Sequence, residues 1–215
     1  MKQEMKLDFF EFEKLEIIVE DLSPCHQIAF SAAMCERMFP IYEVFSQEEG
    51  VGSPQILRRS LDEIWKILHG KLAEVELINT LIKECDEEVV ASESITKSQF
   101  DLEQILAIEV ICVTLDSCLE PTTKKIVRVA ACVTNAIFAF FQLRQEEADP
   151  TWEQKSFIEQ KEFIVNHQLT QQEIQKQEED LLKLQDSKTL DNELLDWLRN
   201  SSSNRCIVDL SWNLN

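Results

Sequence analysis

Residues Cys35 to Trp65 of this 215-residue chain read CERMFPIYEVFSQEEGVGSPQILRRSLDEIW and carry its most specific structural signals. A helix is expected to end just before Pro40, because proline lacks the N–H that would continue the backbone hydrogen bonds. After the linker Gly50-Val51-Gly52, Ser53-Pro54 supplies a capping serine and a proline suited to a first helical turn. Gly70 then provides a stop. The stretch therefore predicts two helices joined by a short linker.

The rest of the chain carries the same helical signature on both sides of this stretch. Only three glycines and five prolines occur in the whole sequence, which leaves too few turns for a fold of many short strands. Apolar residues recur at helical spacing in most of the remaining segments. Helices are predicted over residues 7–22, 24–39, 54–68, 71–90, 102–119 and 122–143, from 150 onward, and within 168–200. These features predict an all-α fold, a single multi-helix domain of about six to eight helices.

The most apolar of these segments, residues 129–141, is expected to be the buried central helix. It is too short, and too interrupted by Thr134 and Asn135, to span a bilayer, which needs about 20 apolar residues.

The predicted helix 71–90 carries the acidic run 86–88 near its carboxyl end, where negative charge opposes the helix dipole. A solvated, frayed end is therefore expected there, followed by a polar loop over 91–98.

Composition divides the chain into a core and an extension. Residues 1–168 are expected to form the helical core domain. Residues 169–200 are rich in Gln, Glu and Lys, with narrow apolar stripes at helical spacing. They predict charged C-terminal helices that either dock loosely on the core or bind another molecule. Residues 201–215 contain a serine-rich linker, which breaks the helical pattern at 201–204, and the strand-like run Cys206–Trp212.

Charge and cysteine content narrow the classes of partner and the compartment. The formal net charge of −19 repels nucleic-acid phosphates and anionic lipids, so neither a nucleic acid nor a membrane is expected as a partner. The seven cysteines sit mostly in apolar runs, where a free thiol behaves as a small hydrophobe. The amino terminus has no apolar segment of the kind found in signal peptides. A reduced, cytoplasmic protein is expected.

No catalytic residue, cofactor site or metal site is predicted. The pair Cys25-His26 and the isolated His69 and His167 do not match zinc-ligand spacings. The glycines are too few for a phosphate-binding loop, so no nucleotide cofactor is expected.

Glu109 is the one acid that stands out, because it is embedded in a strongly apolar run from Ile105 to Val113. Burial would raise its pKa, which is compatible with a catalytic acid but occurs more often in a structural polar network. Arg37 and Arg58 are natural partners for it. A polar clamp between helices is therefore predicted, formed by Glu36, Arg37, Arg58, Asp62, Trp65 and Glu109. The alternative is a set of exposed salt bridges within single helices.

The run CERMFP (35–40), followed by Tyr42 and Phe45, the glycine linker and LRRSLDEIW (57–65), resembles the YjaG-like family of bacterial proteins, domain-of-unknown-function family 416. The resemblance is sharpest over residues 22–68 and weaker to about residue 169. It implies an all-helical, cytoplasmic protein and brings no activity and no catalytic residues. Members of the family generally end near the last core helix, so residues 170–215 are expected to be an addition of this chain.

Three functions are compatible with these observations. The first is a non-enzymatic binding or accessory module whose acidic surface recognises another protein, or a second copy of the chain, near Arg58 and Trp65 or at the C-terminal helices. The second is an acidic immunity or inhibitor protein that covers a basic toxin or nuclease. The third is a small enzyme that uses Glu109 with a nearby arginine, which requires a closed pocket around that residue.

Overall fold

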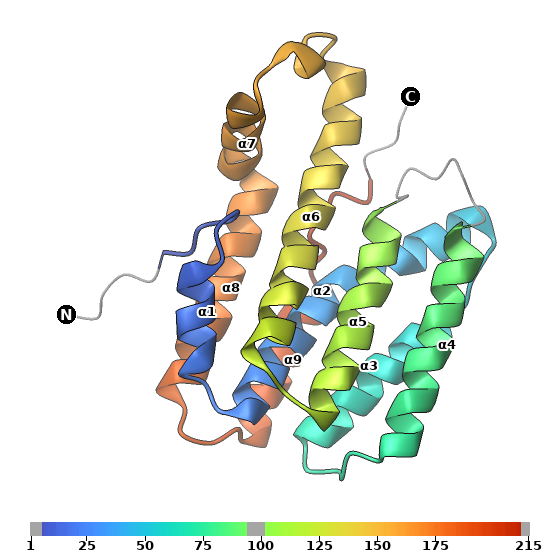
Figure 1. Cartoon of the computed structure of the whole chain (residues 1–215), viewed down its shortest axis with the longest axis vertical. Coiled ribbons are helices and arrows are strands. Elements are labelled where there is room, and N and C mark those ends of the chain that lie inside the picture. The colour runs from blue at the N-terminus through green and yellow to red at the C-terminus, as the bar shows by residue number, and fades with distance from the viewer. Residues whose placement is uncertain (1–5, 94–101, 212–215) are drawn as a thin grey trace.

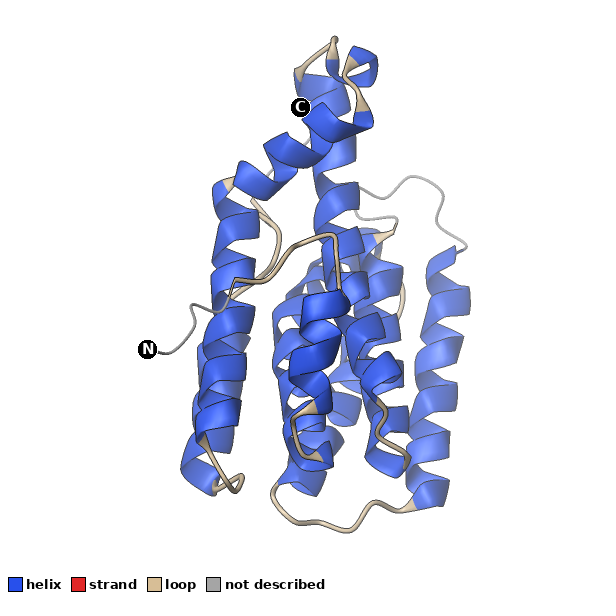
Figure 2. Cartoon of the chain, turned by 60° about the vertical axis from the view of Figure 1, so that its left-hand side comes forward, coloured by secondary structure: helices blue, strands red, loops and turns tan. Residues whose placement is uncertain are grey.

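The structure is a computed structural model that describes residues 6–93 and 102–211 of the chain. Every regular element in these residues is a helix, and no strand occurs in them (Figure 2). The helices are α1 Glu13–Glu20, α2 Pro24–Glu49, α3 Pro54–Leu68, α4 Val75–Glu93, α5 Glu103–Leu119, α6 Thr123–Ala148, the 3-10 helix η1 Trp152–Gln154, α7 Phe157–Asn166, α8 Gln168–Asp186 and α9 Asn192–Ser203. The predicted all-α class is confirmed, with nine α-helices in the described part of the chain.

Segment 129–141 of α6 is mostly buried, as predicted, but α2 is the more central helix. In Figure 1, α2 crosses diagonally behind α5 and α6, and it contacts α3, α5, α6, α8 and α9. Its side chains are buried from His26 to Phe39 without interruption. An all-round buried helix has no preferred apolar face. Helix α2 is overlooked when the longest apolar run is chosen as the central helix, because polar residues interrupt the sequence of α2.

Pro40 lies inside α2, and the predicted end of the helix before this residue is wrong. Proline removes the hydrogen bond to the carbonyl four residues earlier and costs about 3 kcal/mol in a helix interior. The buried Met38, Ile41, Tyr42 and Phe45 flank Pro40. Burying one such side chain contributes roughly 1.5–3 kcal/mol, so packing on both sides of the proline outweighs its cost.

The first helix is shorter than the predicted range 7–22. The Asp8 side chain accepts hydrogen bonds from the backbone N–H groups of Phe10 and Glu11, which holds the chain in a turn. Leu7 and Phe9 in this non-helical segment are nevertheless buried. Local side-chain hydrogen bonding therefore delays the helix to Glu13 while the apolar residues still reach the core.

The acidic run at the end of α4 is not a frayed end, contrary to the prediction. The helix begins at Val75, four residues later than predicted, and continues to Glu93. Glu88 is buried and accepts hydrogen bonds from the Tyr42 hydroxyl and from the backbone N–H of Ser53, the latter at 2.6 Å. These contacts tie α4 to the α2–α3 linker. The predicted polar loop 91–98 is helical to Glu93, and its remainder lies outside the described residues.

The C-terminal region is part of the bundle. Helix α9 continues through the serines 201–203, where a break was predicted, and Ser202 is fully buried. The predicted strand from Cys206 is turns and bends as far as Ser211, and Trp212 lies outside the described residues. Ile207 and Val208 pack into the core instead. An isolated strand would leave its backbone groups without a partner edge, whereas docking these side chains buries them.

Residues 138–166, which we call the arm, extend beyond the ends of α4 and α5 in both ribbon views (Figures 1 and 2). The arm comprises the end of α6, η1 and α7. By length and composition, α6 is the one described helix that could cross a membrane, but 56% of its apolar window is buried within the structure. Burial of this kind is typical of a core helix.

Asp149 lies at the turn between α6 and η1, and we expect the stability of this turn to depend measurably on pH. Hydrogen bonds from Lys155, and then from the Thr151 hydroxyl and N–H, lower the pKa of Asp149 to about 2. The carboxylate therefore stabilises the turn fully above its usual pKa near 4, and this contribution is lost as the pH falls toward 2. Side-chain carboxyl titration by NMR should give the low value, and Lys155→Met should move it toward 4, whereas Lys161→Met should not change it.

Candidate functional site

The most unusual polar residues of the fold are Glu36 and Arg37, neighbours on the central helix α2. Each is only 1% exposed, although charged residues are rarely buried unless they are paired. Adjacent helical residues project about 100° apart, so the two side chains reach different neighbours. Glu36 meets α3 and α9, whereas Arg37 meets α8 and α9.

The Glu36 cluster consists of Glu36, Arg58, Asp62, Trp65 and Arg199. The Arg58 guanidinium binds both carboxylate oxygens of Glu36, at 2.7 and 2.8 Å. Glu36 Oε1 also accepts a hydrogen bond from the Trp65 indole N–H at 2.8 Å and lies 3.2 Å from Arg199 Nε. Asp62 binds Arg58 at 3.1 Å and also binds Arg199. One carboxylate therefore joins three helices.

The Arg37 cluster consists of Arg37, Glu173, Lys176, Asp180 and Ser202. Arg37 holds Glu173 through two parallel hydrogen bonds of 2.8 and 2.9 Å. Its Nη1 atom donates to Asp180 at 3.1 Å and to the Ser202 hydroxyl at 3.0 Å. Lys176 binds Asp180 and lies with Nζ 4.3 Å from the centre of the Trp197 ring. Both cations and both carboxylates of the cluster are less than 5% exposed.

Burial and pairing oppose each other in the pKa values of the Arg37 cluster. Burial alone would lower the pKa of Arg37, but the charges of Glu173 and Asp180 outweigh it and raise this pKa. Burial raises the pKa of Asp180 and lowers that of Lys176, with the ion pairs acting against both shifts. Two cations face two carboxylates, so the cluster is balanced in charge. No carboxylate in it lacks a cation, and the arrangement favours a structural role over acid–base chemistry.

Glu109 lies apart from both clusters. Its side chain is 30% exposed and pairs with Arg128 of α6 at 2.8 Å, on the surface between α5 and α6. The prediction that Glu109 is buried is therefore wrong, because the apolar run around it belongs to a helix whose edge reaches solvent at this position. The structure brings Glu36, Arg58, Asp62 and Trp65 together, whereas Arg37 enters the second cluster and Glu109 enters neither.

Sequence reasoning missed the charged and polar partners on α8 and α9, namely Glu173, Lys176, Asp180, Arg199 and Ser202. One signal was present in the sequence. Glu173, Gln177 and Asp180 are spaced four and three residues apart and continue into Leu184, so they share a helix face with a buried leucine. A polar stripe that runs into an apolar one indicates a buried ion network rather than a loosely docked helix.

A cavity of about 480 Å³ lies beside the Arg37 cluster, between α8 and residues 205–207. Arg37, Lys176 and Arg205 border it, together with Gln172 and Gln175. Within the described residues no three His, Cys, Asp or Glu side chains are grouped so that they could hold a metal ion. Of the Cys25-His26 pair, Cys25 is exposed, whereas His26 is buried and reaches the backbone carbonyl of Ser187 at 3.2 Å.

Comparison with known proteins gives consistent matches. A family model described as "Protein of unknown function (DUF416)" matches residues 14–210. The uncharacterized protein YjaG of Escherichia coli K12 is 31% identical over 153 residues, which cover 68% of this chain and 75% of that protein. YjaG of Salmonella typhimurium is 38% identical over 69 residues, which cover 32% of this chain and 35% of that protein.

A crystal structure of a DUF416 family protein from Shewanella baltica OS155 superimposes with a TM-score of 0.75 at 17% identity, covering 88% of this chain and 93% of that one. At this identity the similarity concerns the fold alone. The matched range 14–210 includes α8 and α9, so the expectation that residues 170–215 are an addition to the family pattern is wrong for nearly all of this range. These helices carry the buried partners of Arg37, which explains why they belong with the core.

Proposed function

This chain belongs to the DUF416 family of proteins of unknown function, and from the surface of its arm we propose that it is a non-enzymatic protein-binding module. The observation that carries the proposal is a pair of bulky apolar side chains held in solvent at the start of α7. Phe157 is 59% exposed and Ile158 is 69% exposed. Adjacent exposed apolar residues on one short helix are a common feature of protein interfaces.

Packing and hydrogen bonds within the arm fix the position of Phe157 and Ile158. Trp152 is fully buried and contacts the Phe163 ring at a centroid distance of 5.4 Å. Its indole N–H donates to Gln142 at 2.7 Å, and Gln142 in turn donates to Gln160 at 3.0 Å. A capping box at Ser156 fixes the start of α7. A preorganised surface loses little conformational entropy when a partner binds.

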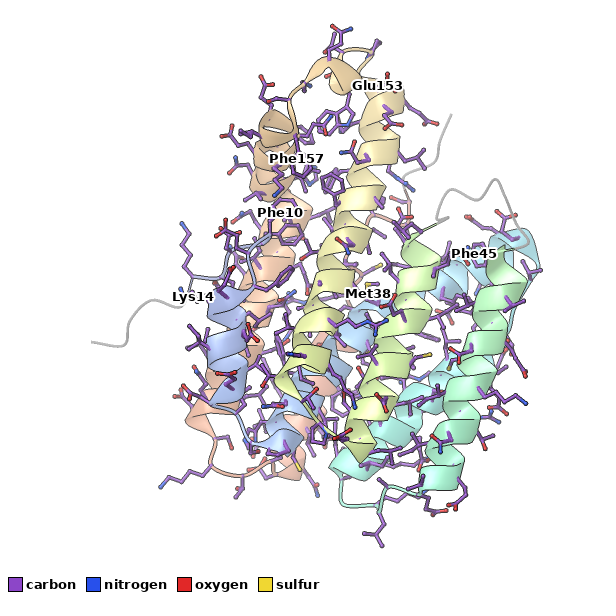
Figure 3. All side chains as sticks on the ribbon, in the orientation of Figure 1. Phe10, Lys14, Met38, Phe45, Glu153 and Phe157 are labelled. Atoms are coloured by element: carbon purple, nitrogen blue, oxygen red, sulfur yellow. The ribbon has the colours of Figure 1, made fainter. Side chains whose placement is uncertain are left out.

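A groove of about 590 Å³ lies next to the exposed pair, between residues 6–11, α7 and α8. Lys161 connects the two features, since its Nζ atom lies 4.4 Å from the Phe10 ring centre and 4.7 Å from that of Phe157. Figure 3 shows Phe10 and Phe157 on the same side of the molecule, near α7. The groove therefore extends the apolar surface of Phe157 and Ile158 toward α8.

Charge around the groove supports a basic partner. Four carboxylates border it, Asp8, Glu11, Glu162 and Glu178, against two lysines, Lys6 and Lys161. A second copy of a chain with a net charge of −19 would be repelled, which argues against self-association at this face. We infer that the partner is a protein segment with apolar side chains flanked by lysine or arginine. The inhibitor alternative requires the same charge in its toxin or nuclease, so it is a special case of this proposal.

The structure gives the enzyme alternative less support than the binding proposal, because that alternative requires a closed pocket around Glu109. That residue pairs with Arg128 and borders none of the cavities described here. The cytoplasmic location and the exclusion of nucleic acids and membranes remain part of the proposal, and the acidic charge supports them.

The double substitution Phe157→Ser with Ile158→Ser is expected to abolish partner capture while leaving the melting temperature within about 2 °C of the wild type, because both side chains are exposed. The matched control is Leu72→Ser with Val75→Ser, which removes two exposed apolar side chains (84% and 52%) far from the arm. Affinity capture from cells that express each tagged form, followed by quantitative mass spectrometry, compares the three proteins.

The proposal requires a protein that wild type and control enrich and that the arm variant loses by at least tenfold. Charge reversal in the groove, Glu162→Lys with Glu178→Lys, should weaken capture of the same protein. Equal recovery by all forms, or enrichment of nothing by the wild type, would overturn the assignment of this surface.

A further inference from the structure

The cavity of about 480 Å³ beside the Arg37 cluster differs in charge from the groove beside the arm. Three cations border the cavity, Arg37, Lys176 and Arg205, against one carboxylate, Glu173. The groove has the opposite balance, with four carboxylates against two lysines. In a chain with a net charge of −19, an excess of cations around a cavity is a local exception that favours the binding of anions.

The Arg37 guanidinium brings an unused hydrogen-bond donor to this cavity. Arg37 is 1% exposed, and its Nη2 atom donates one of its two N–H groups to Glu173 at 2.9 Å. Nε and Nη1 donate to Glu173, Ala33, Asp180 and Ser202. Within residues 6–93 and 102–211, the second N–H of Nη2 has no acceptor. A buried N–H without an acceptor is costly, and an oxygen atom of a bound ligand satisfies it.

Lys176 also keeps donors that the protein does not use. An ammonium group carries three N–H donors. Its Nζ atom donates to Asp180 and faces the Trp197 ring at 4.3 Å, while the carboxylate of Glu179, at 3.8 Å, is too distant for a hydrogen bond. In the described part of the chain, Asp180 is therefore the one hydrogen-bond acceptor of this buried ammonium.

The exposed side of the cavity adds more donors and few acceptors. Arg205, Gln172 and Gln175 border the cavity and are exposed. Their side chains form no hydrogen bond and no ion pair with any residue that the structure describes. A guanidinium binds a carboxylate or a phosphate through two parallel hydrogen bonds, and a glutamine amide can donate to the same oxygen atoms. The donors around this cavity therefore match an oxyanion.

We propose that this cavity binds a small organic anion, a molecule with one carboxylate or phosphate group and a short apolar body. Arg205 and Lys176 bind its oxygen atoms, and the second Nη2 N–H of Arg37 donates to one of them. Leu169 and Ile207, which also border the cavity, contact the apolar body. The volume lies within the range of about 300–1,000 Å³ that is usual for ligand sites. The site is independent of the protein-binding proposal, because no residue of the arm borders it.

Isothermal titration calorimetry of the full chain tests the site with four probes: hexanoate, hexyl phosphate, the neutral hexanamide and inorganic phosphate. We expect the tighter of the two organic anions to bind with a Kd of about 1 mM or below. Hexanamide should bind at least about tenfold more weakly, because it offers no charge to Arg205 and Lys176. Inorganic phosphate should also bind more weakly, because it makes no contact with the apolar side chains. The tighter anion identifies the head group.

Two arginine variants with the same change in charge separate this cavity from general attraction of anions. Arg205→Gln should weaken binding of the tighter probe by at least about tenfold. It should keep the melting temperature within about 2 °C of the wild type, because the side chain is exposed. The matched control is Arg128→Gln, which removes an arginine that is 63% exposed and does not border the cavity, and it should leave the affinity unchanged.

Three results would overturn the proposal. One is a Kd above about 10 mM for both organic anions, which is too weak for a built site of this size. The second is binding of hexanamide or inorganic phosphate as tight as that of the organic anions. The third is an equal loss of affinity in Arg205→Gln and Arg128→Gln.

Discussion

Replacement of Arg37 by alanine is expected to lower the free energy of unfolding by about 3–5 kcal/mol, the usual cost of removing one partner from a buried ion pair. Arg37 is 1% exposed and binds Glu173 and Asp180, which are 4% and 0% exposed. Without the guanidinium, Glu173 keeps the hydrogen bond from the Gln177 amide but no cation, and Asp180 keeps Lys176. A buried carboxylate that loses its cation still bears the cost of its desolvation, which the ion pair had offset.

Urea unfolding followed by circular dichroism measures the change. Arg59→Ala is the matched control, because Arg59 is 55% exposed and pairs with Glu84 on the surface, where an ion pair is worth about 0–1 kcal/mol. A loss for Arg37→Ala no larger than that of the control would contradict a structural role for the buried pair. Arg37 would then be better explained as a residue kept for ligand binding at the neighbouring cavity.

The sequence carried enough information for the positions of most helices, because caps and apolar spacing are local signals. Ser53-Pro54 marks the start of α3, and Glu120-Pro121 separates α5 from α6. Pro40 shows the limit of such signals. A local rule ends the helix there, but packing from the rest of the bundle decides otherwise.

Part of the site was also accessible from the sequence. Arg58, Asp62 and Trp65 lie at three- and four-residue spacing on one helix, so their shared face could be predicted, and Glu36 is close enough in the chain to be a natural partner. The partners of Arg37 could not be found in this way. Glu173 is 136 residues away and Asp180 is 143 residues away, so no local pattern links them to α2.

The C-terminal helices therefore complete the core electrostatically as well as by packing. Helix α9 supplies Arg199 to the Glu36 cluster and Ser202 to the Arg37 cluster, so one helix contacts both charged neighbours of α2. Removal of residues beyond 168 would leave Arg37 without Glu173 and Asp180 in the buried interior and would take Arg199 from the Glu36 cluster. The domain and its supposed extension are accordingly interdependent.

Glu36→Ala is the second substitution with a large expected effect, a loss of about 2–4 kcal/mol. The carboxylate is 1% exposed, accepts hydrogen bonds from Arg58 and the Trp65 indole, and forms an ion pair with Arg199, so its removal leaves these three groups facing a small void. Arg58 and Arg199 are 30% and 35% exposed and regain part of their hydration, which is why the expected loss is smaller than for Arg37→Ala.

The matched control is Glu43→Ala, an exposed glutamate two turns further along α2, which should change stability by less than about 0.5 kcal/mol. A double-mutant cycle of Glu36→Gln with Arg199→Gln isolates the contribution of α9, and residues in direct contact should couple by about 0.5–3 kcal/mol. Additive losses would mean that α9 is held by apolar contacts such as Leu195 and Leu198 alone. Coupling would identify Glu36 as the residue through which the central helix holds α3 and α9 together, since one carboxylate binds donors from both.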